Sequence, residues 1–204
     1  MDKSKLIRKF DKQARIYEGR KPGPAEKEWR EQLLKSARGN VLEVGVGTGA
    51  NFAYYPKDVH VTAVDFSGEM LSRAKESAVR NAISAEFMRQ DIESLSFPEN
   101  TFDTIVSTLT LCGYEDPLHV LRQFKSWCKP DGRILLMEHG ISSSRVIGLL
   151  QHWIDPVHVR MIGCHLNRDI KQLITQAGLE IERMERHFLN AIYLAWTNPG
   201  KANA

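Results

Sequence analysis

The chain has 204 residues, of which 42% are hydrophobic and 26% are charged. This length suits one domain with a sizeable core, and the balance of residue types is that of an ordinary globular protein. The formal net charge of +3 is too small and too scattered to indicate a nucleic-acid partner. No apolar run reaches the ~18 residues that a membrane span needs, so we expect no transmembrane anchor.

Three cysteines, Cys112, Cys128 and Cys164, are odd in number and far apart in the sequence. They form neither a zinc-binding spacing nor a disulfide framework. His158 and His165 have no third ligand at helical spacing, so we expect no metal ion. The first residues also lack the apolar stretch of a signal peptide, and together these features predict a cytoplasmic protein.

The spacing of apolar residues predicts a helical start, followed by alternating strands and helices. Helices are expected over 4–18 and 25–37, which we interpret as an N-terminal helical cap over 1–39. Strands are expected at 40–44, 59–64, 85–88, 104–108 and 133–137, and helices at 68–80 and from Asp116, the N-cap before Pro117. Alternation of this kind is typical of a parallel sheet with right-handed crossovers.

The last third of the chain departs from that alternation. Residues 141–166 form an apolar, helix-like insertion, which we expect on the substrate side of the sheet. A helix follows over 168–177, and strands over 179–188 and 191–197 are joined too closely for a crossover helix, so they should pair antiparallel. We therefore predict a single α/β domain over 1–204, Rossmann-like, with a mostly parallel seven-stranded sheet that ends in an antiparallel hairpin.

A glycine-rich turn, Glu43–Gly49, directly follows the first predicted strand. Glycines are needed where a strand turns sharply into a helix and a ligand approaches the backbone, and the expected helix would present free N–H groups there. Gly45, Gly47 and Ala50 also fit the G-x-G-x-x-G/A pattern of dinucleotide sites, so a nicotinamide cofactor is an alternative.

Three carboxylates favour a methyl donor, S-adenosylmethionine, over a nicotinamide. Glu43 stands two residues before the first glycine, where it can accept from the ammonium group of the donor's methionine portion. Asp65 ends the second strand and can accept from both ribose hydroxyls, which either cofactor carries. In Gln90-Asp91-Ile92, after the third strand, the carboxylate can accept from the adenine amino group while Ile92 packs on the ring. The length also leaves little room for a separate substrate domain.

These motifs resemble those of the class I S-adenosylmethionine-dependent methyltransferases, from Val41 to about Thr197. Glu43–Gly49 resembles the family's first motif, Asp65-Phe66-Ser67 with Met70 its second, Gln90-Asp91-Ile92 its third, and Lys129–Gly132 the turn before the fifth strand. The resemblance implies S-adenosylmethionine as the cofactor. It implies a donor site formed by Glu43, Gly45, Gly47, Thr48, Gly49, Asp65, Phe66, Met70, Gln90, Asp91, Ile92, Thr108 and Leu109.

The second half of the chain resembles the mammalian thiol methyltransferases of the endoplasmic reticulum and their bacterial relatives, which include enzymes for phospholipid amines and quinones. That resemblance is carried by Thr108–Cys112, Met137–His139, Asp155–His158 and Gly163–Arg168. The mammalian group has an apolar N-terminal anchor that this sequence lacks, and peripheral membrane contact stays open. Tyr17 resembles a tyrosine in the N-terminal helix of quinone-type methyltransferases that closes over the donor.

Four residues are candidates for catalysis: Tyr17, His139, Asp155 and His158. His139 follows the fifth strand, at the edge where open α/β sheets bind ligands. Asp155 and His158 belong to the insertion, where a structural role is the alternative for each. Cys112 is expected to form an apolar wall of the donor pocket, because methyl transfer needs no covalent step on the protein.

The expected function is transfer of a methyl group from S-adenosylmethionine to a small, fairly apolar acceptor. A thiol is favoured, because its pKa of about 8.5 leaves it partly ionised at neutral pH without a strong base. Phospholipid amines and quinones are the alternatives, and a donor-binding module without turnover is a second alternative. The chain lacks a basic stripe with stacking aromatics, which argues against a nucleic-acid acceptor. These residues predict no particular oligomeric state.

Overall fold

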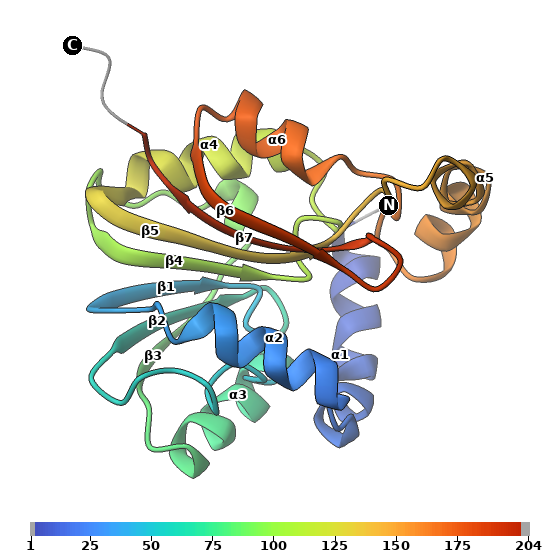
Figure 1. Cartoon of the computed structure of the whole chain (residues 1–204). Coiled ribbons are helices and arrows are strands. Elements are labelled where there is room, and N and C mark those ends of the chain that lie inside the picture. The colour runs from blue at the N-terminus through green and yellow to red at the C-terminus, as the bar shows by residue number, and fades with distance from the viewer. Residues whose placement is uncertain (1–2, 201–204) are drawn as a thin grey trace.

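A seven-stranded sheet carries the fold, and helices cover both of its faces (Figure 1). The computed structural model describes residues 3–200. The strand order is β3-β2-β1-β4-β5-β7-β6, and β7 alone runs in the direction opposite to the other strands. The strands are β1 (Asn40–Val44), β2 (His60–Asp65), β3 (Ser84–Arg89), β4 (Phe102–Thr108), β5 (Cys128–His139), β6 (Glu180–His187) and β7 (Ile192–Asn198). The predicted fold class and its C-terminal hairpin are confirmed.

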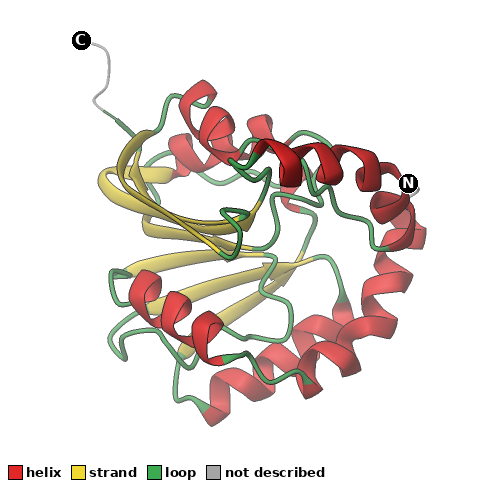
Figure 2. Cartoon of the chain, turned by 45° about the vertical axis from the view of Figure 1, so that its right-hand side comes forward, coloured by secondary structure: helices red, strands yellow, loops and turns green. Residues whose placement is uncertain are grey.

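The helices form a layer on each side of the sheet (Figure 2). They are α1 (Lys3–Gly19), α2 (Pro24–Leu34), α3 (Gly68–Arg80), α4 (Pro117–Trp127), α5 (Arg145–Met161) and α6 (Ile170–Gln176). One hydrophobic core joins the sheet to α4 and α6, and a second joins the opposite face to α2 and α3. Strand β1 is buried on both faces of the sheet, because Leu42 packs in the first core and Val41 in the second. Both faces of the strand must therefore be apolar.

Side-chain caps fix the starts of α3 and α4. The Asp116 carboxylate accepts a hydrogen bond from the backbone N–H of His119 at 2.9 Å, and Pro117 occupies the first turn, as predicted. Ser67 caps α3 by accepting from the N–H of Met70 at 3.2 Å. These caps hold α3 and α4 against the sheet directly beside the carboxyl ends of β2 and β4.

Two local predictions were wrong. The helix expected after the glycine-rich turn is not formed within the described residues, where successive turns occupy 47–54 instead. Gly47 and Gly49 adopt positive φ angles of 55° and 78°, which a right-handed helix does not contain. The turn expected at 129–132 lies within β5, where Phe102 pairs with Cys128 but Thr104 pairs with Arg133. Residues 129–132 therefore form an irregularity in the pairing of β4 with β5.

Helices α1 and α5 both lie beyond the carboxyl ends of the parallel strands (Figure 1). The Lys9 ammonium group donates a hydrogen bond to the backbone carbonyl of Met161, which joins the two helices. In residues 3–200, no helix has the length and apolar character needed to cross a bilayer. This edge of the sheet is where ligands bind in open α/β folds.

Candidate functional site

A pocket of about 340 Å³ opens at the carboxyl ends of β1, β2 and β4, under α1. All of the predicted donor-binding residues except Gly49 line it, and so do Tyr17 and His139. Gly49 does not line the pocket, and a Cβ atom added to it would come within 2.7 Å of the Phe52 ring. Parallel strands bring these separate motifs together because their carboxyl ends meet at one edge.

The glycine-rich turn brings its backbone into the pocket. Gly45 has a φ of 60°, and a Cβ atom on it would lie 2.4 Å from the Thr110 methyl group. The N–H of Gly47 donates to one oxygen of the Asp65 carboxylate at 2.9 Å. Glycine is therefore required by the close approach at Gly45 and by the left-handed backbone at both positions.

Asp65 is fixed by backbone groups on both of its oxygens. Oδ1 accepts from the N–H of Ser67 and Oδ2 from the N–H of Gly47, each at 2.9 Å. Burial raises the pKa of this carboxyl group above its ordinary value, and the two N–H groups oppose that rise. Each oxygen keeps a free lone pair for a ligand.

Glu43 is buried at the floor of the pocket. Its oxygens accept from the Asn51 amide and from the Tyr55 hydroxyl, each at 2.9 Å. Burial raises the pKa of Glu43 to about 7, although those hydrogen bonds and the charge of Arg30 act in the opposite direction. Arg30 also donates to Asn51 and pairs with Glu26 at 2.9 Å, so α2 supports the carboxylate from behind.

A second buried carboxylate, Glu138, shapes the turn after β4. It accepts from the hydroxyl of Ser107 at 2.7 Å and from the N–H groups of Thr110 and Leu111 at 2.9 and 3.2 Å. Burial raises the pKa of Glu138 to about 7. Leu109, which lines the pocket, has a φ of 59°, a strained backbone that these bonds hold in place.

Helix α1 closes the donor side of the pocket. The rings of Phe10 and Phe66 meet edge to face with centroids 5.3 Å apart. The hydroxyl of Ser67 donates to the Asp11 carboxylate, next to the backbone that holds Asp65. Burial raises the pKa of Tyr17, which keeps its hydroxyl protonated at neutral pH. These contacts place the predicted N-terminal cap against the pocket.

Two cysteines and a histidine form the wall opposite the carboxylates. The ligand atoms of Cys112, His139 and Cys164 all lie within 4.8 Å of one another. Cys112 lines the pocket, as predicted, and its thiol donates to the carbonyl of Leu109 at 3.6 Å. The neighbouring Cys112 thiol and His139 imidazole favour the ionised form of Cys164 and lower its pKa to about 5, although burial opposes them.

Asp155 and His158, both candidates for catalysis, do not line this pocket. Asp155 accepts from the N–H of Leu166 at 2.6 Å and contacts His165 Nδ1 at 2.9 Å. His158 Nδ1 is 2.7 Å from the carbonyl oxygen of Cys164. Both side chains therefore hold the segment after α5, which positions Cys164 at the pocket.

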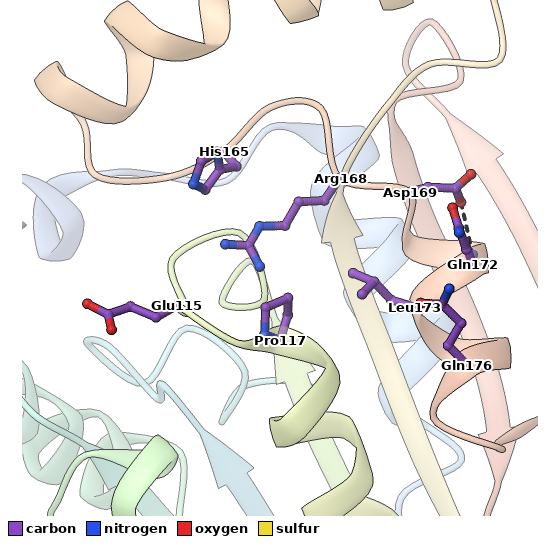
Figure 3. Close-up of a pocket in the computed structure, with 8 residues that line it drawn as sticks. All are labelled: Glu115, Pro117, His165, Arg168, Asp169, Gln172, Leu173 and Gln176. Atoms are coloured by element: carbon purple, nitrogen blue, oxygen red, sulfur yellow. Dashed lines mark hydrogen bonds between the residues drawn. The ribbon is translucent and has the colours of Figure 1, made fainter.

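A second cavity, of about 400 Å³, lies between the start of α4 and α6 (Figure 3). Arg168 extends across it toward Pro117, and its guanidinium group donates to the carbonyl of Tyr114. The N–H of His165 donates to the carbonyl of Cys112 at 3.0 Å. These two bonds fasten the segment after α5 to the turn after β4.

Several residues of the site were missed in the sequence. Asn51, Thr110 and Tyr114 line the pocket, and Glu138 organises its wall, but none of them has a spacing that signals a role. Glu138 stands inside the run Met137–His139 that carried the closer resemblance, and this was the only available signal. Its partners lie 27 to 31 positions away, which periodicity does not reveal.

Comparison with known proteins agrees with this geometry. Residues 42–136 match a family model described as a methyltransferase domain. A phosphatidylethanolamine N-methyltransferase from Cereibacter sphaeroides is 37% identical over 103 residues, which cover 50% of this chain and 51% of that protein. A thiol S-methyltransferase from Rattus norvegicus is 29% identical over 154 residues, covering 71% of this chain and 62% of the other. The chain thus spans about half the length of the first relative.

A solved structure extends the similarity to nearly the whole fold. The DhpI–SAH complex superimposes with a TM-score of 0.70 at 19% identity, covering 96% of each chain. Identity this low shows the shared fold alone, whereas the family model covers the strands that carry the donor motifs. The chain is thus similar to the class I S-adenosylmethionine-dependent methyltransferases, and residues 42–136 match their methyltransferase domain.

Proposed function

We propose that this chain transfers a methyl group from S-adenosylmethionine to a small, fairly apolar acceptor, and that the acceptor atom is a thiol sulfur. One observation carries the donor assignment: Glu43, Asp65 and Asp91, from the ends of three neighbouring strands, line a single pocket. Their order across the sheet matches the order of amino acid, ribose and adenine in an extended donor molecule. The solved DhpI structure, which has the same fold, is a complex with SAH (S-adenosylhomocysteine), the demethylated form of the donor.

Each donor contact has a matched residue. The free lone pairs of Glu43 accept from the donor's ammonium group, and those of Asp65 accept from the ribose hydroxyls. Asp91 accepts from the adenine amino group, and Ile92, which is buried beside it, packs on the ring. An ammonium group beside Glu43 favours the ionised carboxylate and so opposes the burial that raises its pKa.

The acceptor side of the pocket suits a nucleophile that needs orientation more than deprotonation. His139, Cys112 and Cys164 form this wall, and no lysine is among the residues that line the pocket. The donor's sulfonium already activates its methyl group, so alignment of the nucleophile with the C–S bond is the main requirement. Such alignment contributes as much as about 7–11 kcal/mol. The thiol S-methyltransferase among the relatives supports the same acceptor.

A lipid amine is the second candidate acceptor, and helix α5 favours it. This helix exposes seven large apolar side chains: Val146, Leu149, Leu150, Trp153, Ile154, Val157 and Met161. An exposed apolar surface of this kind marks an interaction site. Arg145 and Arg160 are exposed on α5, whereas its only acid, Asp155, is buried, so the helix suits a membrane surface with anionic lipids. The phosphatidylethanolamine N-methyltransferase among the relatives supports this candidate.

The three cysteines are free thiols in the structure. Unpaired cysteines suit a reducing compartment, which supports a cytoplasmic location for this activity. A helix that lies on a membrane surface without crossing it is compatible with that location.

An acceptor panel tests the proposal. Purified chain is incubated with labelled S-adenosylmethionine and, in separate reactions, alkyl thiols, phosphatidylethanolamine vesicles and quinols. We expect labelled methyl thioether from the thiols and consumption of the donor over time. Asp65→Asn provides a donor-site control and, at limiting donor concentration, should reduce transfer to every acceptor. Robust turnover of the lipid amine or a quinol with none of any thiol would overturn the thiol assignment. Donor binding without consumption would instead leave a binding module.

A further inference from the structure

Three side chains with sulfur or nitrogen ligand atoms converge on the acceptor wall. Cys112 follows β4, His139 ends β5 and Cys164 follows α5, so the sheet edge assembles them from distant segments. Their ligand atoms lie within 4.8 Å of one another. In residues 3–200, no other set of three His, Cys, Asp or Glu side chains meets this closely. All three line the pocket that holds the donor carboxylates.

The cluster is supported by neighbours that orient its backbone. His158 Nδ1 contacts the carbonyl of Cys164 at 2.7 Å, and the N–H of His165 donates to the carbonyl of Cys112 at 3.0 Å. His165 is itself held by Asp155 at 2.9 Å. These contacts fix the path of the backbone at Cys112 and Cys164, and so the positions from which the two thiols enter the pocket.

One nitrogen of the His139 imidazole lacks a hydrogen-bond partner in the described part of the chain. Nδ1 of the His139 imidazole is buried, and among the described residues it makes no hydrogen bond. A buried polar atom without a partner costs free energy, and native proteins satisfy nearly all of them. A neutral imidazole nitrogen is also the commonest metal ligand in proteins. The unpartnered nitrogen is thus an independent reason to look for a bound ion.

We propose that Cys112, His139 and Cys164 bind a zinc ion whose fourth ligand is the sulfur of the acceptor thiol. Two cysteine sulfurs and one imidazole are a ligand set that zinc prefers, and zinc sites that act on substrates keep one position open. The open position here faces the pocket that contains Glu43 and Asp65. This inference rests on the proposed thiol acceptor and specifies how that thiol is held.

The chemistry balances without any further reactant. The acceptor thiol binds zinc as a thiolate and releases its proton to solvent. A lone pair of the thiolate sulfur forms a bond to the methyl carbon of the donor. The C–S bond of the sulfonium breaks, and its electron pair stays on the donor sulfur, which becomes a neutral thioether. The methylated acceptor is also a neutral thioether, a weaker ligand than a thiolate, and it leaves the metal.

Cobalt titration of the full chain tests the site by spectroscopy and does not depend on activity. Reduced, metal-free protein is titrated with Co²⁺, whose absorption reports thiolate ligation in the near ultraviolet and tetrahedral geometry in the visible range. We expect one Co²⁺ per chain and a spectral change when an alkyl thiol is added. Cys112→Ser, Cys164→Ser and His139→Gln should each weaken binding by at least about tenfold, the scale on which even supporting residues act.

Cys128 provides the matched control. It is also buried, but its thiol donates to the carbonyl of Arg133 at 3.7 Å at the start of β5, away from the pocket. Cys128→Ser should bind Co²⁺ as the unmodified chain does. Because a ligand variant can fail to fold, X-ray absorption on the zinc-loaded, unmodified chain provides a second measurement. We expect zinc–sulfur distances of about 2.3 Å and a zinc–nitrogen distance of about 2.0 Å.

The outcomes separate this inference from the proposed function. Co²⁺ binding that is absent, or unchanged in Cys112→Ser and Cys164→Ser, overturns the zinc site. A Cys112–Cys164 disulfide that persists in reductant overturns it as well. Undiminished thiol methylation by chelator-treated protein overturns the zinc site while the methyltransferase proposal stands. Thiol-sensitive Co²⁺ binding through the three ligands supports the site even if no thiol is methylated, and the thiol acceptor alone then fails.

Discussion

At the scale of single residues, the proposed donor site contains carboxylates that neighbouring protein groups hold in place. Asp65 is the clearest test, because backbone N–H groups hold both of its oxygens at 2.9 Å. Asp65→Asn removes the charge that the ribose hydroxyls meet, and a hydrogen bond to a charged group contributes about 1.5–3 kcal/mol. We expect at least about tenfold weaker binding of S-adenosylhomocysteine (SAH) by calorimetry.

Asp58→Asn is the control for that change, since Asp58 is exposed on the turn before β2 and does not line the pocket. It should leave the dissociation constant unaltered. Thermal melts of both variants establish that they are folded. Unchanged SAH affinity in folded Asp65→Asn would remove Asp65 from the donor site.

Glu43 connects the site to pH-dependent stability. Burial raises its pKa from 4.5 to about 7, so between those values the folded protein holds a proton that the unfolded chain has released. The resulting stabilisation is complete below about pH 4.5 and is lost as the pH rises through about 7, a change on the order of 3 kcal/mol. Glu43→Gln should remove that part of the pH dependence in urea unfolding, measured without donor from pH 4.5 to 8.

Glutamine keeps an oxygen for Asn51 and an amide for Tyr55, so the buried hydrogen bonds survive the substitution. Glu99→Gln, on an exposed loop, is the control and should retain the slope of the unmodified chain. Identical slopes in the unmodified chain and Glu43→Gln would show that Glu43 is not the titrating group.

At the scale of elements, helix α5 carries an apolar face that nothing in the described chain covers. Trp153 is 77% exposed and Leu150 is 54% exposed. Burying such side chains in a bilayer interface contributes about 1.5–3 kcal/mol each, so changing both to glutamine should weaken binding to anionic vesicles by at least about tenfold. Sedimentation with vesicles measures the change, and a blue shift of tryptophan emission reports insertion of Trp153.

Val79→Gln is the matched control, because Val79 is 81% exposed on α3, in a different part of the surface. It should bind vesicles like the unmodified chain. If the unmodified chain shows no affinity for anionic vesicles, the membrane surface and the lipid-amine candidate lose their support.

The two segments that flank the pocket opening form a second element-scale prediction. We expect residues 3–24 and 141–166 to act as a lid, because α1 contributes Phe10 and Tyr17 to the pocket and the segment after α5 contributes Cys164. Hydrogen exchange in both segments should slow when SAH binds. Strand β1 is buried and paired on both sides, so its exchange serves as the internal reference. Unchanged exchange in both segments would contradict the lid.

At the scale of the whole molecule, donor binding should raise the melting temperature. A ligand at one hundred times its dissociation constant stabilises the folded state by about 2.7 kcal/mol. For a chain of this size each kcal/mol corresponds to about 2–4 °C, so SAH should raise the melting temperature by about 5–10 °C. NADH at the same concentration is the comparison. A shift with NADH and none with SAH would restore the dinucleotide alternative.

The sequence by itself determined the order and type of nearly every element. The apolar run at 40–44 forms β1, the helical spacing at 68–80 forms α3, and Asp116 before Pro117 starts α4. These features are local, since burial on both faces, an amphipathic period and a capping side chain each act within a few residues. The motifs predicted residues that line one pocket for the same reason, because each is a short continuous stretch at the end of one strand.

Only the tertiary structure decided which distant side chains meet. Cys112, His139 and Cys164 have no spacing that predicts a shared site, yet parallel strands and the segment after α5 bring them to one wall. The structure likewise directs Asp155 and His158 away from the pocket and toward the backbone of 164–166. Contacts of this kind depend on how the chain crosses the sheet and on the path of its loops. Hydrophobic periodicity carries no information about either, because it records only which face of each element is buried.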